Sequence, residues 1–123
     1  MNIPSTSCYA VYAVIFISKR SAQESEYPET AKRMLKLAQE QPGFLGVVSA
    51  RREDGVGVTI SYWADERSIR AWRDQSEHQQ ARLKGRTKWY EGYSVQIAKI
   101  ERAYSLDKTD KSAFVSKGLT NGE

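Results

Sequence analysis

Cysteine and histidine are scarce in this chain: Cys8 and His78 are the only ones among its 123 residues. A single cysteine cannot form an intrachain disulfide, and it excludes a metal site built from four thiolates. With one histidine and one distant cysteine, neither a zinc site nor a cysteine–histidine dyad is expected. The phosphate loop, the dinucleotide glycine motif and the nucleophile elbow are also missing. Any chemistry must therefore use a reactive substrate or a bound cofactor.

Long apolar runs are absent as well. The run from Cys8 to Ile17 is about ten residues long, too short to span a bilayer. Residues 1–7 carry no Lys or Arg, so the run does not look like a signal peptide. We expect a cytoplasmic protein that does not associate with membranes.

The net charge of +4 arises from 19 basic and 15 acidic residues. The basic residues are scattered, and no more than two are consecutive. A nucleic-acid-binding surface needs basic residues gathered on one face. We therefore expect no nucleic-acid partner.

The length favours one domain, because typical domains have roughly 100–150 residues. We expect a flexible lead at residues 1–8, a folded domain at 9–104, and a polar, mobile tail at 105–123.

Apolar periodicity predicts the order strand, helix, strand, strand, helix, strand. The first strand is apolar on both faces, as is typical of a central strand. Asp54-Gly55 predicts a type I′ hairpin. Asp65 fits the N-cap of the second helix, and Ser76 could cap a further segment, so one helix or two kinked helices fit the region. The expected strands span about 9–18, 44–53, 56–63 and 93–104, and the first helix spans about 28–41.

This order predicts an α+β fold of the ferredoxin-like βαββαβ type, with an antiparallel sheet. Right-handed crossovers place both helices on one face of the sheet. The other face would leave Val11, Ile15 and Ile17, or their alternates, against water in a monomer. That area is larger than soluble monomers usually expose, so we expect a homodimer.

One segment concentrates residues suited to chemistry. His78, Arg82 and Arg86 recur at i+4 steps, with Tyr90 next, and share one face if the helix is unbroken. In a functional interpretation, His78 moves a proton near neutral pH, and Arg82 or Arg86 neutralises an enolate, phenolate or carboxylate. In the structural interpretation, this is a solvated basic face. The predicted catalytic residues are His78, Arg86 and Trp72, and the predicted substrate-binding residues are Trp63, Arg82, Trp89, Tyr90 and Tyr62.

The tryptophans and tyrosines of this set allow two interpretations. Trp63 and Trp72 either anchor helix to sheet or line a pocket for a small aromatic molecule. The hydroxyls of Tyr62 and Tyr90 could donate to a developing oxyanion, although most tyrosines serve packing.

Three segments resemble the antibiotic biosynthesis monooxygenase family: QPGFLGVVSAR (41–51), GVGVTISYW (55–63) and residues 69–104. The Tyr-Trp pair that ends the third strand, followed by a helix with Trp and Glu-His, is similar to the family layout. The resemblance implies a dimeric α+β barrel with a pocket between helices and sheet in each subunit. It also implies a class containing cofactor-free oxygenases of anthrones and quinols, and haem-degrading enzymes.

The haem-degrading branch of that family has an Asn on the first strand, a Trp on the second helix and a His ten residues later. Trp72 matches the Trp, but Arg82 stands at the His position and Ala13 or Val14 at the Asn position. These departures argue against haem degradation of that type. Trp72 and Arg86 are the residues that carry over from the polyketide-oxygenase members.

The leading functional hypothesis is a monooxygenase-like enzyme that oxygenates a small phenolic or quinol-type aromatic substrate with no cofactor and no metal. The alternative is a non-catalytic dimer that binds haem or another planar ligand, with His78 as an axial ligand. A third possibility is a stress or housekeeping dimer with a vestigial pocket.

Overall fold

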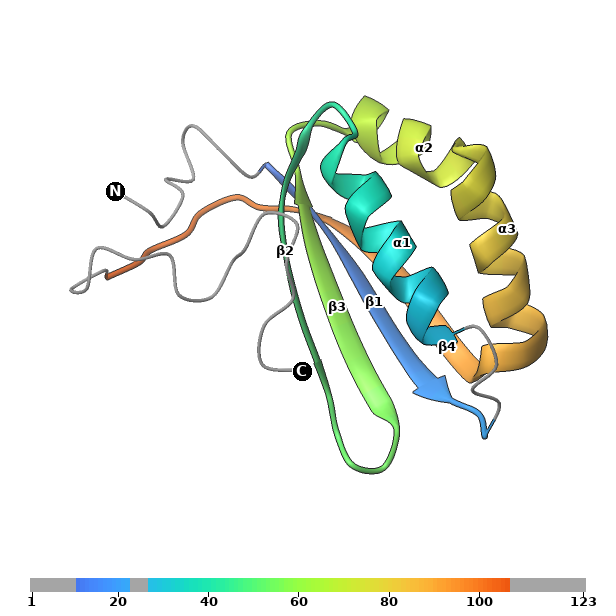
Figure 1. Ribbon diagram of the computed structural model, residues 1–123. Coiled ribbons are helices and arrows are strands. Elements are labelled where there is room, and N and C mark those ends of the chain that lie inside the picture. The colour runs from blue at the N-terminus through green and yellow to red at the C-terminus, as the bar shows by residue number, and fades with distance from the viewer. Residues whose placement is uncertain (1–10, 23–26, 107–123) are drawn as a thin grey trace.

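The computed structural model describes residues 11–22 and 27–106. Four strands form one sheet, and the helices lie on one side of it (Figure 1). The elements are β1 (Tyr12–Arg20), α1 (Tyr27–Gln39), β2 (Phe44–Arg51), β3 (Val56–Trp63), α2 (Glu66–Asp74), α3 (Ser76–Lys84), the π-helical turn η1 (Gly85–Trp89) and β4 (Tyr90–Lys99).

The sheet is antiparallel, with the strand order β2-β3-β1-β4. β1 pairs with β3 on one side and β4 on the other, as its two apolar faces predict. This order, with the helices on one face, is the ferredoxin-like α+β fold, so the predicted fold class is confirmed. The order also leaves β4 as an edge strand.

The hydrophobic core lies toward the β2–β3 half of the sheet. Trp63 is fully buried there, beneath Ile69 of α2 and Ala38 of α1. Phe44 and Val47 of β2 complete the cluster. Every residue of β4 after Tyr90 is exposed. The helix layer therefore covers one half of the sheet well and the β4 edge poorly.

The β2–β3 hairpin forms as predicted, but its turn differs from the expected type I′. The Gly55 amide donates to the Arg52 carbonyl at 3.0 Å, so Glu53 and Asp54 are the central residues of the turn. Gly55 follows with a φ of 91°, and the Arg52 amide donates to the Val56 carbonyl at 2.8 Å. This is the pattern of a three-residue hairpin loop with a bulge. The Asp54 carboxylate favours it by accepting from the Val56 amide at 3.1 Å.

The helical region after β3 consists of two helices with a break at Gln75. Asp65 caps α2, as predicted, by accepting from the Ser68 amide at 2.7 Å. Gln75 has an extended backbone, and its side-chain oxygen accepts from the His78 amide at 2.8 Å. The cap of α3 is therefore Gln75 and not Ser76, because the carboxamide reaches the first turn from the preceding residue.

The last strand departs from the prediction at both of its ends. The last strand begins at Tyr90, three residues earlier than expected, and ends at Lys99. The expected lead at 1–8 and most of the expected tail lie outside the described residues. No helix in residues 11–22 and 27–106 is long and apolar enough to cross a membrane.

Candidate functional site

His78 lies in the first turn of α3, and its ring is partly buried. Its Nδ1 atom lies 2.8 Å from the Trp72 carbonyl oxygen. A carbonyl can only accept, so Nδ1 carries the proton of the neutral ring and Nε2 carries the lone pair. Burial lowers the pKa of His78; the Trp72 carbonyl opposes this shift, and the nearby charge of Arg82 adds to it. The imidazole is therefore neutral near pH 7, with a basic Nε2.

A continuous row of rings connects His78 to the core. The imidazole stacks on Trp72 with centroids 4.0 Å apart and planes 12° apart. Trp72 stacks at 6.4 Å on Trp63, which in turn meets the ring of Phe44 edge-on at 5.3 Å. Trp63 has no exposed surface, so its ring packs against Trp72 inside the core and cannot contact a ligand. Trp72 and His78 are the members of the row that retain exposed surface.

The side of α3 that carries His78 also carries small residues. His78 and Gly85 are seven residues apart and so share one helical side, with Ala81 between them. Gly85 abuts the first residue of β4, because a Cβ there would lie 2.8 Å from Cε2 of Tyr90. This side of α3 thus ends in small residues, and none of the side chains of α3 is buried.

β4 presents an apolar surface that the helices leave uncovered. Tyr93, Val95 and Ile97 pair with Ser18, Phe16 and Val14 of β1, on the helix-facing side. Their exposed fractions are 40%, 51% and 54%. We call these three residues the β4 strip. The alternation of apolar residues in β4 was visible in the sequence, but it predicted only a strand. Strands that helices cover and strands that they leave uncovered show the same alternation.

Arg82 and Arg86 lie on an open hollow along α3. The hollow has a volume of about 440 Å³ and combines two guanidiniums with carboxamide and hydroxyl groups. Arg82 also donates to the Arg73 carbonyl at 3.3 Å, and its charge acts on His78. Arg82 therefore borders both the hollow and the imidazole. The residues that line the hollow are Ser76, Gln79, Gln80, Arg82, Leu83 and Arg86.

The predicted face of His78, Arg82, Arg86 and Tyr90 is interrupted. The α-helix ends at Lys84, and the Tyr90 amide donates to the Gly85 carbonyl, closing a π-helical turn. A π turn takes more residues than an α-helical turn, so it shifts the side chains that follow. The condition for one shared face, an unbroken helix, is therefore not met, and Tyr90 begins β4.

Trp89 and Tyr90 belong to a separate aromatic cluster at the start of β4. Trp89 is 3% exposed and meets the Tyr27 ring edge-on at 5.4 Å. Burial raises the pKa of the Tyr90 phenol, and a hydrogen bond to the Tyr27 hydroxyl adds to the shift. The Arg20 guanidinium lies 3.5 Å above the Tyr27 ring. The cluster joins β4 to the first turn of α1.

Tyr62 is separated from all of these residues by the sheet itself. It pairs with Ala13 of β1 and directly precedes Trp63, so its side chain lies on the face without helices. Among the described residues, no group of three or more His, Cys, Asp or Glu side chains is arranged to hold a metal ion.

Residues 10–84 match the family model described as "Antibiotic biosynthesis monooxygenase". The chain belongs to this family. A relative in this group is the uncharacterized protein YqjZ of Bacillus subtilis (strain 168), which is 54% identical over 91 residues, or 74% of this chain and 80% of the relative.

Solved structures share the fold of this antibiotic biosynthesis monooxygenase family member. SnoaB, described as a cofactor-independent oxygenase from Streptomyces nogalater, superimposes with a TM-score of 0.66 at 16% identity, covering 76% of this chain and 96% of SnoaB. Rv0793 from Mycobacterium tuberculosis gives 0.67 at 12% identity, covering 76% and 98%. At such identities the likeness concerns the fold alone.

The family match extends from the start of the fold to the end of α3. It includes Trp63, Trp72, His78 and Arg82, and it ends before Arg86 and the β4 strip. The stack and the His78 imidazole thus lie within the part of the chain that carries the family pattern.

Proposed function

We propose that this family member oxygenates a small phenolic or quinol-type aromatic molecule without a flavin or a metal. The observation that carries the proposal is the neutral imidazole of His78, whose Nδ1–H is bonded to the Trp72 carbonyl while Nε2 keeps its lone pair. A general base at neutral pH needs this state. The similarly folded SnoaB is described as a cofactor-independent oxygenase, which supports the reaction class.

The proposed substrate position lies between the outer end of the ring row and the β4 strip. Trp72 and the strip would provide flat apolar contact for an aromatic ring. His78 would remove a proton through Nε2. Arg82, whose charge already acts on the imidazole, would stabilise the resulting anion, and Arg86 would add a second positive charge.

The proposed reaction uses dioxygen as the oxidant. His78 takes a proton from an acidic carbon of the substrate, and the delocalised anion passes one electron to dioxygen. The substrate radical and superoxide combine into a peroxide, which loses water to give a carbonyl. Overall, a CH2 group and one O2 become a C=O group and one H2O, and His78 returns its proton to the water that leaves.

The direct test uses purified protein with no added cofactor and an anthrone in aerated buffer. We expect anthrone oxidation above the buffer rate, with one O2 consumed for each quinone formed, and unchanged activity after treatment with a chelator. Arg86→Ala should slow the reaction, whereas Arg67→Ala, on the exposed surface of α2, should not. A rate equal to that of buffer across a panel of anthrones and quinols would refute the proposal.

A second candidate function is haem binding through the same atom, Nε2 of His78. An imidazole that donates through Nδ1 and keeps a lone pair on Nε2 has the form in which histidine binds metals. Binding of haem would then produce a saturable change in the Soret band, and His78→Ala should abolish it. A spectrum that does not change on titration with haem rules this candidate out, and a change that survives His78→Ala places haem elsewhere.

We also propose that the face of the sheet without helices pairs with a second copy of the chain. Ile17 is 39% exposed on that face. The same face carries four further β-branched side chains, which a partner could bury. These are Ile15, Val48, Val58 and Ile60.

Placing a charge on this face should therefore break the dimer. We expect Ile17→Asp to elute as a monomer in size-exclusion chromatography with light scattering, because a carboxylate cannot be buried unpaired. Val95→Asp is the control, since Val95 is 51% exposed on the opposite face, and it should remain dimeric. A wild-type monomer, or an Ile17→Asp dimer of unchanged affinity, would contradict the proposal.

A further inference from the structure

We propose that the Arg33–Glu77 ion pair is a clasp that holds α3 as a hinged lid beside the β4 strip and thereby positions His78. The role of this ion pair in catalysis rests on the proposed function. The claim that it restrains the motion of α3 rests only on the contacts of α3.

The first observation is that α3 is weakly anchored. None of its side chains is buried. It packs against α1, α2 and η1, and within residues 11–22 and 27–106 it makes no comparable contact with a strand. Local opening is easiest for elements that bury few side chains. α3 is therefore the helix of this fold best suited to move.

The second observation is that α3 is bounded by a backbone irregularity at each end. At its N-terminal end, Gln75 is extended and interrupts the helix. At its C-terminal end, α3 runs into the π-helical turn η1. Motions of rigid elements are absorbed by a few residues at their ends, and π turns are often found at functional sites. The two ends are therefore placed to act as hinges.

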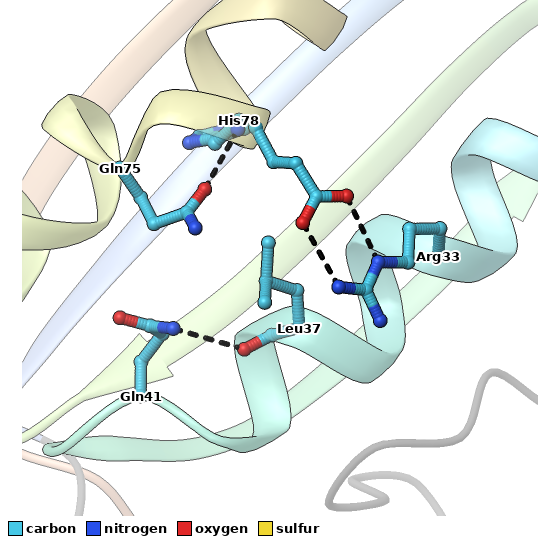
Figure 2. A network of polar contacts seen from close by, with 6 residues as sticks. Arg33, Leu37, Gln41, Gln75 and His78 are labelled. Atoms are coloured by element: carbon cyan, nitrogen blue, oxygen red, sulfur yellow. Dashed lines mark hydrogen bonds and ion pairs between the residues drawn. The ribbon is translucent and has the colours of Figure 1, made fainter.

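The third observation is the clasp. Arg33 of α1 donates to Glu77 of α3 through two parallel hydrogen bonds, Nε to Oε2 and Nη2 to Oε1, each 2.9 Å long. Figure 2 shows Arg33 directed at the first turn of α3, where His78 lies. Arg33 stands one turn before the buried Leu37, so its own helix is fixed in the core. The clasp thus connects a fixed helix to a weakly held one.

These contacts explain why a residue outside the site could control it. Glu77 directly precedes His78, so a closed clasp fixes the turn that stacks the imidazole on Trp72. When the clasp opens, α3 can pivot about its two ends, which separates His78 from Trp72. Arg33 and Glu77 are positioning residues in this scheme, since neither need touch the substrate.

Hydrogen exchange tests the lid directly and requires no activity. In Glu77→Gln, we expect the amides of residues 76–84 to exchange about two- to fivefold faster, the range that a surface ion pair can account for. The amides of α1 and the strands should be unchanged. Glu66→Gln is the matched control, because it removes an ion pair of similar exposure within α2 and should leave residues 76–84 unaffected.

A second readout follows the imidazole, which is the only one in the chain. Its ring protons lie over Trp72 and should resonate upfield of their free values in the wild type. Glu77→Gln should reduce this displacement, and the charge-reversed pair Arg33→Glu with Glu77→Arg should restore it along with slow exchange. Unchanged exchange in residues 76–84, acceleration across the whole fold, or an unaltered imidazole signal would overturn the proposal, whatever the outcome of the oxidation assay.

Discussion

Replacing His78 by alanine should lower the rate of anthrone oxidation about 10²–10⁴-fold, the usual contribution of a general base. The expected loss follows from Nε2, which carries the lone pair of the neutral ring. The change should appear in kcat more than in KM, because Trp72 and the β4 strip remain to bind the ring. Steady-state kinetics on the purified variants measure it. His78→Gln should be equally slow, since a carboxamide cannot take the proton.

The pH profile gives the same residue a second test. The ordinary pKa of histidine is 6.5, and burial lowers the pKa of His78 below it. The base acts in its unprotonated form, so kcat/KM should be flat at neutral pH and fall only in acid below 6.5. The contribution of His78 to the free energy of unfolding depends on pH in the same direction. This contribution is complete above pH 6.5, and it declines as the pH falls toward the lowered pKa of His78 in the folded state. An acidic limb centred above pH 7, or a His78→Ala enzyme of wild-type rate, would remove His78 from the mechanism.

Replacing Trp63 by alanine should lower the free energy of unfolding by about 3–5 kcal/mol. The indole is fully buried and supports Trp72 by stacking, and its Nε1 donates to the Ser61 hydroxyl at 2.9 Å. Removing it leaves a cavity, an unpaired hydroxyl and an unsupported Trp72. Since small domains are stable by roughly 5–15 kcal/mol, this variant should lie near the limit of folding. Urea unfolding followed by circular dichroism measures the change.

Two controls separate packing from other effects of this substitution. Trp63→Phe keeps a ring against Phe44 and should cost less than the alanine change. Tyr104→Ala removes an aromatic ring that is 87% exposed and should alter the unfolding free energy by less than about 0.5 kcal/mol. If Trp63→Ala lowered the free energy of unfolding no more than Tyr104→Ala does, the Trp63 ring would not stabilise the fold as its burial indicates.

Most of the fold could be predicted because local patterns determine it. Two apolar faces marked β1 as central, Asp65 marked the start of α2, and the alternation around Gly55 marked the hairpin. Right-handed crossovers then left one arrangement of the helices. The turn type was not predictable from Asp54-Gly55 alone, because the hydrogen bond from the Val56 amide to the Asp54 carboxylate favours a longer loop.

The site was predictable only in its residue types. Helical spacing placed His78, Arg82, Arg86 and Tyr90 together, but the π-helical turn moved Tyr90 into a different cluster. Such a turn gave no recognisable pattern in the sequence. The burial of Trp63 and the position of Tyr62 depend on which side of β3 faces the helices, and that choice is made by the partner strands.

The sequence by itself determined the order of the elements and the central strand, because periodicity and capping act over a few neighbouring residues. It indicated the family through the resemblance of three segments. Only the tertiary structure decided which nitrogen of His78 stays basic, since the Trp72 carbonyl that holds Nδ1 lies across the break between two helices. It also decided that the β4 strip stays uncovered, because coverage depends on where the helices pack, and in the described part of the chain α3 packs mainly against η1, α2 and α1.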